Sequence, residues 1–243
     1  WYESKYEKEF AHSTEVNALL SAPVCDLLAG FTLYEPSLEP EADVARTPDH
    51  DGAKPLRQRP WIKLQMLAAS RAYHSSPMTI VVARQFAERT IRSMDDLVGM
   101  RVGTSAASLG GTLLARYRKG ILLKDMVTLR AIDNPLEHLD KGAFDATLVE
   151  LHAFDMYRLQ NRGSTLQASA FRHPLNFNMG FVALERNRTL LDEVDRAITT
   201  FLESGHIATL ARESGVTYVP PIVPNVRPVF TLEPFHDPAG AGG

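Results

Sequence analysis

Small polar residues follow a short predicted strand in the stretch from Ser93 to Leu114, and their spacing suits ligand binding. Ser93 is predicted to start a helical turn that Gly99 ends in the left-handed conformation. Residues 100–104 then form the strand, and a helical run follows the small polar residues. A strand that enters a helix through a Ser- and Gly-rich turn leaves backbone N–H groups free at the helix N-terminus, where an anion or a carbonyl oxygen is favoured. An ordinary connection that holds no ligand has the same pattern.

Glu150 is the single side chain best placed to bind a ligand. It follows a predicted strand over Asp145–Val149, so it would stand at the carboxyl end of a parallel sheet, where open α/β sheets bind ligands. A solvated carboxylate at a strand end is the alternative interpretation. The aromatic residues Tyr73 and Phe177 could line the same cleft, although core packing is the more common role of such side chains.

Motifs of the common enzyme classes are absent from the sequence. There is no HExxH, CxxC, GxSxG or P-loop pattern, and GTSAASLGG lacks the GK[ST] ending that holds a nucleoside triphosphate. Asp95 and Asp96 are adjacent, and helix capping explains them. Asp145 and His152 each suit a structural role better than catalysis or metal binding, and His152 is expected to point away from Glu150. We therefore expect no enzymatic activity, no cofactor and no metal.

The composition predicts a soluble globular protein of one or two domains. A chain of 243 residues can bury a substantial core, and its formal net charge of −3 argues against nucleic-acid binding. No apolar run approaches the roughly 20 residues needed to span a membrane. Trp1 is not an initiator methionine, which predicts that the native N-terminus has been removed or left out.

Cys25 is the one cysteine of the sequence. In a cytosolic chain a single buried thiol is ordinary, whereas in an exported protein an odd cysteine indicates a partner in sequence that precedes this chain. The apolar run around Cys25 offers no base to hold the thiolate, so catalysis by this residue is not expected.

The remaining sequence alternates between strand and helix patterns, which predicts parallel sheets. Strands are predicted over residues 24–30, 76–82, 127–132 and 176–184, and helices from Ser13 or Thr14 to Leu20 and over residues 135–141, 152–159, 189–202 and 206–213. Residues 61–71 fit either a helix or an extended segment. The helix over residues 189–202 is the clearest, because its apolar residues share one face: Leu190, Leu191, Val194, Ile198 and Leu202.

Two long segments have no regular pattern. Residues 35–60 are rich in proline and charge and are longer than a compact connection. Disorder or a solvated insertion is favoured for them over a functional surface loop. The tail over residues 217–243 has too many prolines for regular structure and is predicted to lie across the surface.

From about Ser75 to Gly215 the order of motifs resembles the family 3 periplasmic solute-binding proteins, which include the amino-acid receptors of ABC transporters. The resemblance rests on YHSSPMTIVV, MDDLVGMRVGTSAAS, FDATLVE and NMGFVALERNRTLLDEVDRAITTFLESGHIATLARESGV, with VCDLLAGFT matching the strand and loop that close the first lobe. It implies an α/β, two-lobed fold of the type II periplasmic binding proteins, with parallel-type sheets flanked by helices, two hinge crossovers and a cleft that clamps a small ligand. The implied lobes are residues 1–82 with 185–243, lacking the family's first strand and helix, and residues 83–184.

The sequence departs from the family at its ligand contacts. The arginine that clamps the ligand carboxylate, seven residues after the glycine that matches Gly30, is replaced by Ser37. The family's ligand turn corresponds to residues 107–109, and its amine-binding aspartate corresponds to Glu150. Losing the clamp removes about 1.5–3 kcal/mol of charge-assisted hydrogen bonding, which argues against ordinary capture of α-amino acids. Arg84 and Arg101 could replace it, although solvation is their more common role.

A narrower resemblance is to the binding-protein homologues encoded beside quinoprotein methanol dehydrogenases (the MxaJ/XoxJ type). They carry a Cys-Asp pair that matches Cys25-Asp26 and a second cysteine in the first strand. This resemblance implies that Cys25 forms a disulfide with a cysteine outside this chain. It also implies a periplasmic accessory protein that binds a pyrroloquinoline quinone (PQQ)-dependent methanol dehydrogenase, or its cytochrome, during maturation or activation.

Two alternatives to the accessory protein remain open. One is an ABC-transporter receptor for an amino acid or another small polar or cationic solute, and the other is an enzyme built on the same fold. For a bound ligand, the expected contacts are Thr104, Ser108, Glu150, Tyr73 and Phe177. No nucleic-acid partner and no membrane span are expected.

Overall fold

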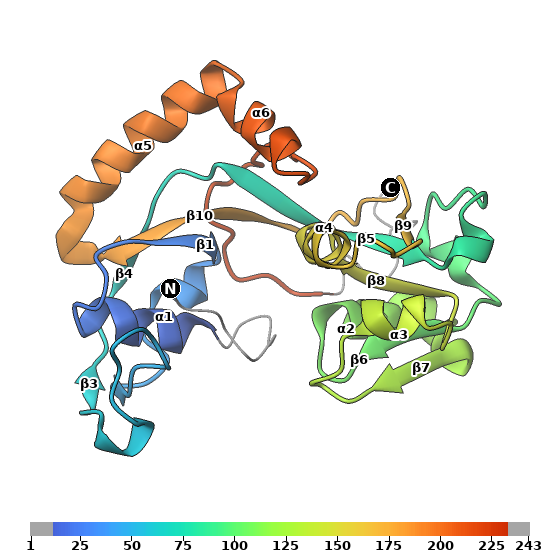
Figure 1. Ribbon diagram of the computed structural model, residues 1–243, viewed down its shortest axis with the longest axis horizontal. Coiled ribbons are helices and arrows are strands. Elements are labelled where there is room, and N and C mark those ends of the chain that lie inside the picture. Colours follow the sequence, from blue (N-terminus) through green and yellow to red (C-terminus); the bar gives the residue numbers. More distant parts are fainter. Residues whose placement is uncertain (1–11, 233–243) are drawn as a thin grey trace. The chain divides into compact units, whose positions relative to one another are not determined.

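The computed structural model describes residues 12–232 of the chain, which form two compact units (Figure 1). Of the described residues, unit 1 contains residues 12–75, 177–210 and 218–229, and unit 2 contains residues 76–176, 211–217 and 230–232. Each unit is therefore assembled from segments that are far apart in the sequence.

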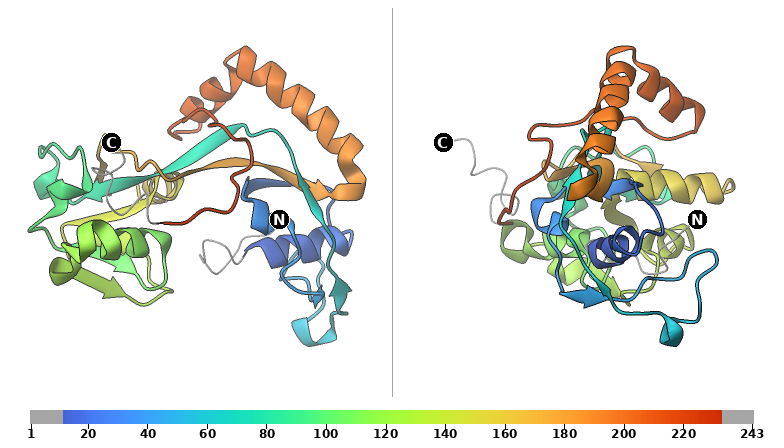
Figure 2. Two further views of the ribbon diagram at one scale, coloured as in Figure 1. Left: turned by 180° about the vertical axis from the view of Figure 1, so that it is seen from behind. Right: turned by 90° about the vertical axis from the view of Figure 1, so that its left-hand side faces the viewer.

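Three strands of unit 1 lie between two helices, as Figures 1 and 2 show. The central strand β10 (Asn176–Leu184) pairs antiparallel with β1 (Leu28–Thr32) and with β4 (Leu67–Ala69). The helices are α1 (His12–Ser21) on one face of these strands and α5 (Arg188–Glu203) on the other.

Alternate residues of β10 face the two helices of unit 1. Val182 and Leu184 belong to a buried cluster that contains Val16 and Leu20 of α1. Ala183, between them, belongs to a second cluster with Leu191 of α5. This alternation follows from the two-residue period of a strand, and the apolar sequence of β10 allows both faces to be buried.

The antiparallel pairing of β1, β4 and β10 differs from the parallel-type sheets that the sequence predicts for both lobes. Parallel neighbours need a crossover connection, usually an α-helix. The connection from β1 to β4 contains only two short 3-10 turns, η1 (Glu35–Leu38) and η2 (Leu56–Gln58), and the two-residue strands β2 (Val44–Ala45) and β3 (Ile62–Lys63). Both β1 and β4 run opposite to β10, so they run in the same direction as each other, and this connection is the crossover between them, built without a helix.

Residues 35–60 follow a defined path, and most of their side chains are exposed or partly exposed, as in a solvated insertion. The Arg59 side chain is buried and donates hydrogen bonds to the carbonyl oxygens of Thr47 at 2.8 Å and Lys54 at 2.5 Å. It also forms an ion pair with Asp49. One buried guanidinium thus holds a segment that has little regular structure, and residues 61–71 continue from it as extended chain through β3 and β4.

Unit 2 contains a sheet with both parallel and antiparallel strand pairs, together with three α-helices in its described residues. Its strand β6 pairs in parallel with β7 and with β8, while β5 pairs antiparallel with β8 and with β9. The strands are β5 (His74–Val82), β6 (Val102–Ser105), β7 (Met126–Leu129), β8 (Ala146–Glu150) and β9 (Gln167–Ala168). The helices α2 (Leu109–Arg116) and α4 (Leu151–Gln160) directly follow β6 and β8, and α3 (Pro135–Asp140) follows β7. The predicted parallel pairing is confirmed for β6, β7 and β8.

The division between the units falls at the start of β5 and at the start of β10. The sequence-based lobes divide the chain at the ends of the same two strands, after residues 82 and 184, and so assign each strand to the other lobe. Hydrogen bonding explains the difference. From Met78 onward β5 pairs with strands of unit 2, whereas from Met179 onward β10 pairs with strands of unit 1.

Most predicted elements are present, with small shifts at their ends. The helix α6 (His206–Glu213) and strand β10 have the predicted bounds. Ser93 and Asp96 form a capping box, in which the Ser93 N–H donates to Asp96 Oδ2 at 3.0 Å, and Gly99 has the expected positive φ of 83°. Strand β1 begins at Leu28, so the predicted strand over residues 24–30 is displaced.

The described part of the tail, up to residue 232, contains no helix or strand, as predicted. Polar side chains fasten it to unit 1 instead. Asn178 Oδ1 accepts from the Ile222 N–H at 2.8 Å, and Asn225 Oδ1 accepts from the Ala72 N–H at 2.7 Å. Among the described helices, none has the length and apolar character needed to cross a membrane.

His173 is buried beside β5, where its backbone N–H donates to the Met78 carbonyl at 2.9 Å. Its ring Nδ1 accepts a hydrogen bond from the Leu175 N–H at 3.0 Å. Burial lowers the pKa of His173 from its usual 6.5 to about 4. The ring is therefore neutral at pH 7, as its role as an acceptor requires.

Replacing Gly103 by alanine should destabilise unit 2 severely. A Cβ at this position would lie 2.1 Å from Cζ of the fully buried Phe144 ring. We expect Gly103→Ala to lower the free energy of unfolding by about 1–3 kcal/mol or more, measured by urea denaturation, because overpacking forces the core to shift.

The matched control for Gly103→Ala is Gly163→Ala, because a Cβ at Gly163 would meet no atom within 4 Å. Adding Phe144→Leu should restore part of the stability lost in Gly103→Ala. Equal midpoints for the two single glycine variants would contradict the close packing of Gly103 and Phe144.

His173 should make unfolding sensitive to mild acid. Its folded-state pKa lies below its unfolded value, so the unfolded chain binds the proton first, and stability falls as pH drops from about 6.5 to about 4. The shift corresponds to roughly 3 kcal/mol over that range. In His173→Asn the amide oxygen can still accept from Leu175, so its stability should change less over the same range in chemical denaturation. Parallel pH profiles for the two proteins would rule out this contribution of His173.

Candidate functional site

The carboxyl end of β6 brings two of the predicted site residues, Thr104 and Ser108, into contact. Their hydroxyl oxygens lie 3.0 Å apart. Ser108 caps α2, because its Oγ accepts from the Gly111 N–H at 3.0 Å and donates to the Ser105 carbonyl at 2.9 Å. Ala107, just before the cap, has a positive φ of 61°, a conformation that costs a non-glycine residue energy and often occurs at binding sites.

The start of α2 packs directly on β8, the strand that carries Glu150. A Cβ at Gly110 would lie 2.3 Å from the Leu148 carbonyl oxygen, so only glycine allows the helix to approach the strand this closely. Since β6 and β8 are parallel, both have their carboxyl ends at the same edge of the sheet. The turn at Ser108 and the Glu150 carboxylate therefore belong to one edge of unit 2.

Glu150 is paired with His152, contrary to the expectation that the two side chains point apart. Glu150 Oε2 lies 3.2 Å from His152 Nδ1, and Ser76 Oγ lies 2.6 Å from the same nitrogen. The two residues stand at the junction where β8 ends at Glu150 and α4 begins at Leu151, and even a continued strand would place residues two apart on the same face. Both side chains are partly exposed, at 27% for Glu150 and 39% for His152, so solvent and solutes can reach the pair.

Tyr73 and Phe177 belong to unit 1, whereas Thr104, Ser108 and Glu150 belong to unit 2. The Tyr73 hydroxyl oxygen accepts from the Gly30 N–H at 3.0 Å, its ring lies 5.3 Å from that of Phe181, and burial raises the pKa of Tyr73. Phe177 is buried. Its ring packs edge-on against Tyr34, at 6.1 Å between centroids. Packing within unit 1 accounts for both aromatic residues.

Arg101, one of the two cations considered for the carboxylate clamp, has a structural role. Arg101 forms an ion pair with Asp145 at 2.7 Å. Burial alone would raise the pKa of Asp145, but hydrogen bonds from the Arg101 guanidinium and backbone N–H outweigh it, so this pKa is lowered. Ser37 is buried in η1, and Arg84 begins the exposed 3-10 turn η3 (Arg84–Phe86).

Arg227 is a cation that the sequence analysis missed. Its guanidinium carbon lies 5.4 Å from the Phe177 ring centroid, a cation–π distance, and burial lowers its pKa. Its backbone is held by hydrogen bonds with Leu33 and Glu35. The surrounding prolines indicate only an irregular tail, so no sequence signal singled this residue out.

Cys25 lies before β1 rather than inside a strand, and its side chain is half-buried against the apolar cluster of unit 1. Burial and the neighbouring Asp26 carboxylate both raise the pKa of the thiol. The thiol is thus poorly suited to nucleophilic chemistry. A disulfide with a cysteine outside this chain stays a prediction.

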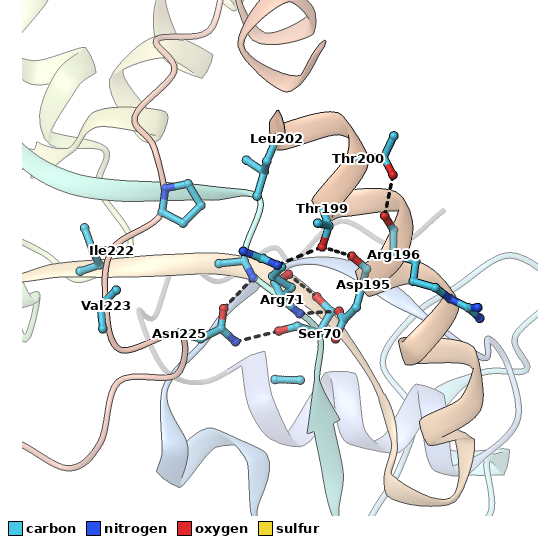
Figure 3. A pocket seen from close by; sticks show the side chains of 13 residues that line it. Ser70, Arg71, Asp195, Arg196, Thr199, Thr200, Leu202, Ile222, Val223 and Asn225 are labelled. Carbon is cyan, nitrogen blue, oxygen red and sulfur yellow. Dashed lines mark hydrogen bonds between the residues drawn. The ribbon is translucent and has the colours of Figure 1, made fainter. Parts of the chain in front are cut away.

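Unit 1 also contains a cavity of about 910 Å³ that the sequence analysis did not predict (Figure 3). Its walls come from the end of β4 and the segment after it, the C-terminal half of α5 and the tail. Arg71 and Asp195 are among the lining residues, and the Arg71 guanidinium donates to Thr199 Oγ1 at 3.0 Å. These residues come from three segments distant in sequence, so no local pattern could indicate the cavity.

Removing the cap of α2 should weaken unit 2 without unfolding it. We expect Ser108→Ala to lower the free energy of unfolding by about 1 kcal/mol, because the Gly111 N–H loses its acceptor. Ser108→Asn should lose far less, since asparagine caps helices as well as serine does. Equal losses for both variants in urea denaturation would show that the capping bond is not what Ser108 contributes.

Comparison with known proteins supports the fold. No family model matches the chain. The chain is 29% identical over 143 residues to the L-cystine-binding protein TcyK of Bacillus subtilis (strain 168), and the match covers 58% of this chain. It covers 51% of TcyK, so the chain spans about half the length of this curated relative.

Solved structures resemble the chain over longer stretches. A histidine kinase sensor domain with similarity to periplasmic binding proteins aligns at 17% identity with a TM-score of 0.51, covering 85% of this chain and 76% of that one. The GluR0 ligand-binding core in complex with L-glutamate aligns at 15% identity with a TM-score of 0.51, covering 82% and 76%. The unliganded L-cystine solute receptor of Neisseria gonorrhoeae aligns at 17% identity with a TM-score of 0.50, covering 63% and 62%. The chain therefore has the mixed α/β, two-lobed fold of the type II periplasmic binding proteins.

Proposed function

We propose that the chain is a non-enzymatic, periplasmic solute-binding protein for an amino acid or another small polar solute that carries an amino group. The observation that carries this proposal is the meeting of the Ser108 turn and Glu150 at one edge of unit 2. The fold shared with binding proteins makes such an edge a reasonable place for a ligand, but the residues themselves decide its chemistry.

The two groups of this edge have complementary chemistry. The Glu150 carboxylate accepts hydrogen bonds and pairs with an ammonium group. The start of α2, with the Gly110 N–H and the Thr104 and Ser108 hydroxyls, suits a carboxylate or carbonyl oxygen. An amino acid presents both kinds of group a few ångströms apart.

The names of two similar proteins indicate which solute to test first. TcyK is named for L-cystine, as is the Neisseria receptor, which makes L-cystine the first solute to test. The association with a PQQ-dependent methanol dehydrogenase or its cytochrome rests on the Cys25-Asp26 pair, the missing carboxylate clamp, the long segment 35–60 and the proline-rich tail, and none of these relatives supports it. Solute binding is therefore the function we propose.

Glu150→Gln should weaken solute binding while leaving the fold intact. The purified chain is titrated with L-cystine, L-cysteine, L-arginine and L-glutamate by isothermal calorimetry, with thermal shift as a second readout. For the solute that binds, we expect Glu150→Gln to raise Kd by roughly 10- to 100-fold, because a charge-assisted hydrogen bond is lost.

The matched control is Glu137→Gln, which removes an exposed carboxylate that pairs with Lys141 on α3 of the same unit. It should leave Kd unchanged. Binding that is equally tight in the wild type and in Glu150→Gln would contradict the assigned site, and the absence of binding to any amino solute would contradict the proposed function.

A further inference from the structure

The cavity of unit 1 is a groove whose floor and walls are fixed by hydrogen bonds (Figure 3). Its floor is the segment Ala69–Ala72, one wall is α5 from Asp195 to Leu202, and the other wall is the tail from Pro221 to Asn225. Asn225 fastens the tail to the floor, because Oδ1 accepts from the Ala72 N–H at 2.7 Å and Nδ2 donates to the Ser70 carbonyl at 3.0 Å.

An arginine and an aspartate stand in this groove without forming an ion pair with each other. Asp195 Oδ1 accepts from the backbone N–H of Arg71 at 2.5 Å. Among the described residues, the hydrogen-bond partner of the Arg71 guanidinium is the Thr199 hydroxyl, at 3.0 Å, and no carboxylate lies within ion-pair distance of it. Thr199 in turn donates to the Asp195 carbonyl at 2.7 Å. Both charged groups are thus held in place while most of their hydrogen-bonding capacity stays open.

Apart from Arg196 and Thr200, the remaining side chains that line the groove are apolar. Leu202 lies on the helix side, and Pro221, Ile222 and Val223 lie on the tail side. Val223 is 95% exposed, which is unusual for a valine in an ordered segment. Asn178 holds the backbone of Ile222 through its N–H and its carbonyl, at 2.8 Å each. The position of the apolar wall at Ile222 is therefore fixed by contacts within the chain itself.

We propose that this groove binds the carboxyl terminus of a peptide or protein whose last residues are aliphatic. A guanidinium binds a carboxylate through two parallel hydrogen bonds, and Arg71 has donors left for both. The Asp195 carboxylate accepts the N–H of the residue next to the terminus, and the aliphatic side chains pack on Leu202, Ile222 and Val223. Carboxyl termini offer this combination of groups within a few ångströms of one another.

The size of the groove favours a peptide over a single amino acid. Pockets of about 300–1,000 Å³ hold drug-sized ligands, and at about 910 Å³ this groove lies at the upper end of that range. Prolines at 221 and 224 restrict the tail, which lowers the entropy lost when a ligand is bound. All residues of the groove belong to unit 1, so this site is distinct from the one around Glu150 in unit 2.

The test compares one tripeptide in two forms. Acetyl-Ala-Leu-Leu with a free carboxylate and the same peptide with a C-terminal amide are titrated into the full chain by isothermal calorimetry. Methyl NMR of Leu202, Ile222 and Val223 locates the binding. We expect the free acid to bind at least tenfold more tightly than the amide and to shift these methyl resonances.

Arg71→Met should weaken binding of the acid at least tenfold. The matched control is Arg186→Met, which removes another exposed arginine of unit 1 with one side-chain partner, Gln65. Arg71→Lys keeps the charge but loses the paired donors, so it should bind weakly while folding normally. Glu150→Gln should bind the peptide like the wild type, which separates this site from the proposed solute site.

Three results would overturn the proposal. Equal binding of acid and amide would show that the carboxylate is not recognised, and unchanged binding by Arg71→Met and Arg71→Lys would remove the arginine from the site. Free leucine that binds as tightly as the tripeptide, or the absence of binding up to about 1 mM, would show that the groove does not hold a peptide terminus.

Discussion

The close approach of α2 to β8 is the constraint on which the candidate solute site depends. Gly110 allows the helix to lie against the Leu148 carbonyl, and Gly103 allows β6 to pass the end of the buried Phe144 ring. A side chain at either position would push α2 or β6 outward and move the Ser108 turn away from Glu150. Gly103 and Gly110 have φ angles that other residues also adopt. Glycine is therefore needed at both positions because it has no side chain, and not because its backbone is more flexible.

Much of this edge could be predicted from local sequence. The polar turn after β6, the cap at the start of α2 and the carboxylate at the end of β8 all have short-range signals, since capping residues and strand ends are local features. Parallel pairing of β6, β7 and β8 followed from the alternation of strands and helices. The family resemblance then implied two lobes.

The features that sequence reasoning missed all depend on contacts between distant segments. The sequence-based lobes place β5 and β10 in the wrong units, because strand pairing and not chain order decides to which unit a strand belongs. Residues 35–60 are held by one buried arginine, Arg59, whose partners are irregularly spaced. The pairing of Glu150 with His152 arises at the exact point where a strand gives way to a helix, and the groove around Arg71 needs three separate segments.

The two units thus carry different kinds of polar surface. The edge of unit 2 combines a carboxylate with the hydroxyl groups at the start of α2, whereas the groove of unit 1 combines a guanidinium with an apolar wall. The most direct test of the central claim is an NMR titration of the full chain with L-cystine that follows the backbone amides of residues 105–111 and 150–152. Saturable shifts concentrated in these residues are expected if L-cystine binds at this edge. Saturable binding that leaves them unmoved would contradict the assigned site.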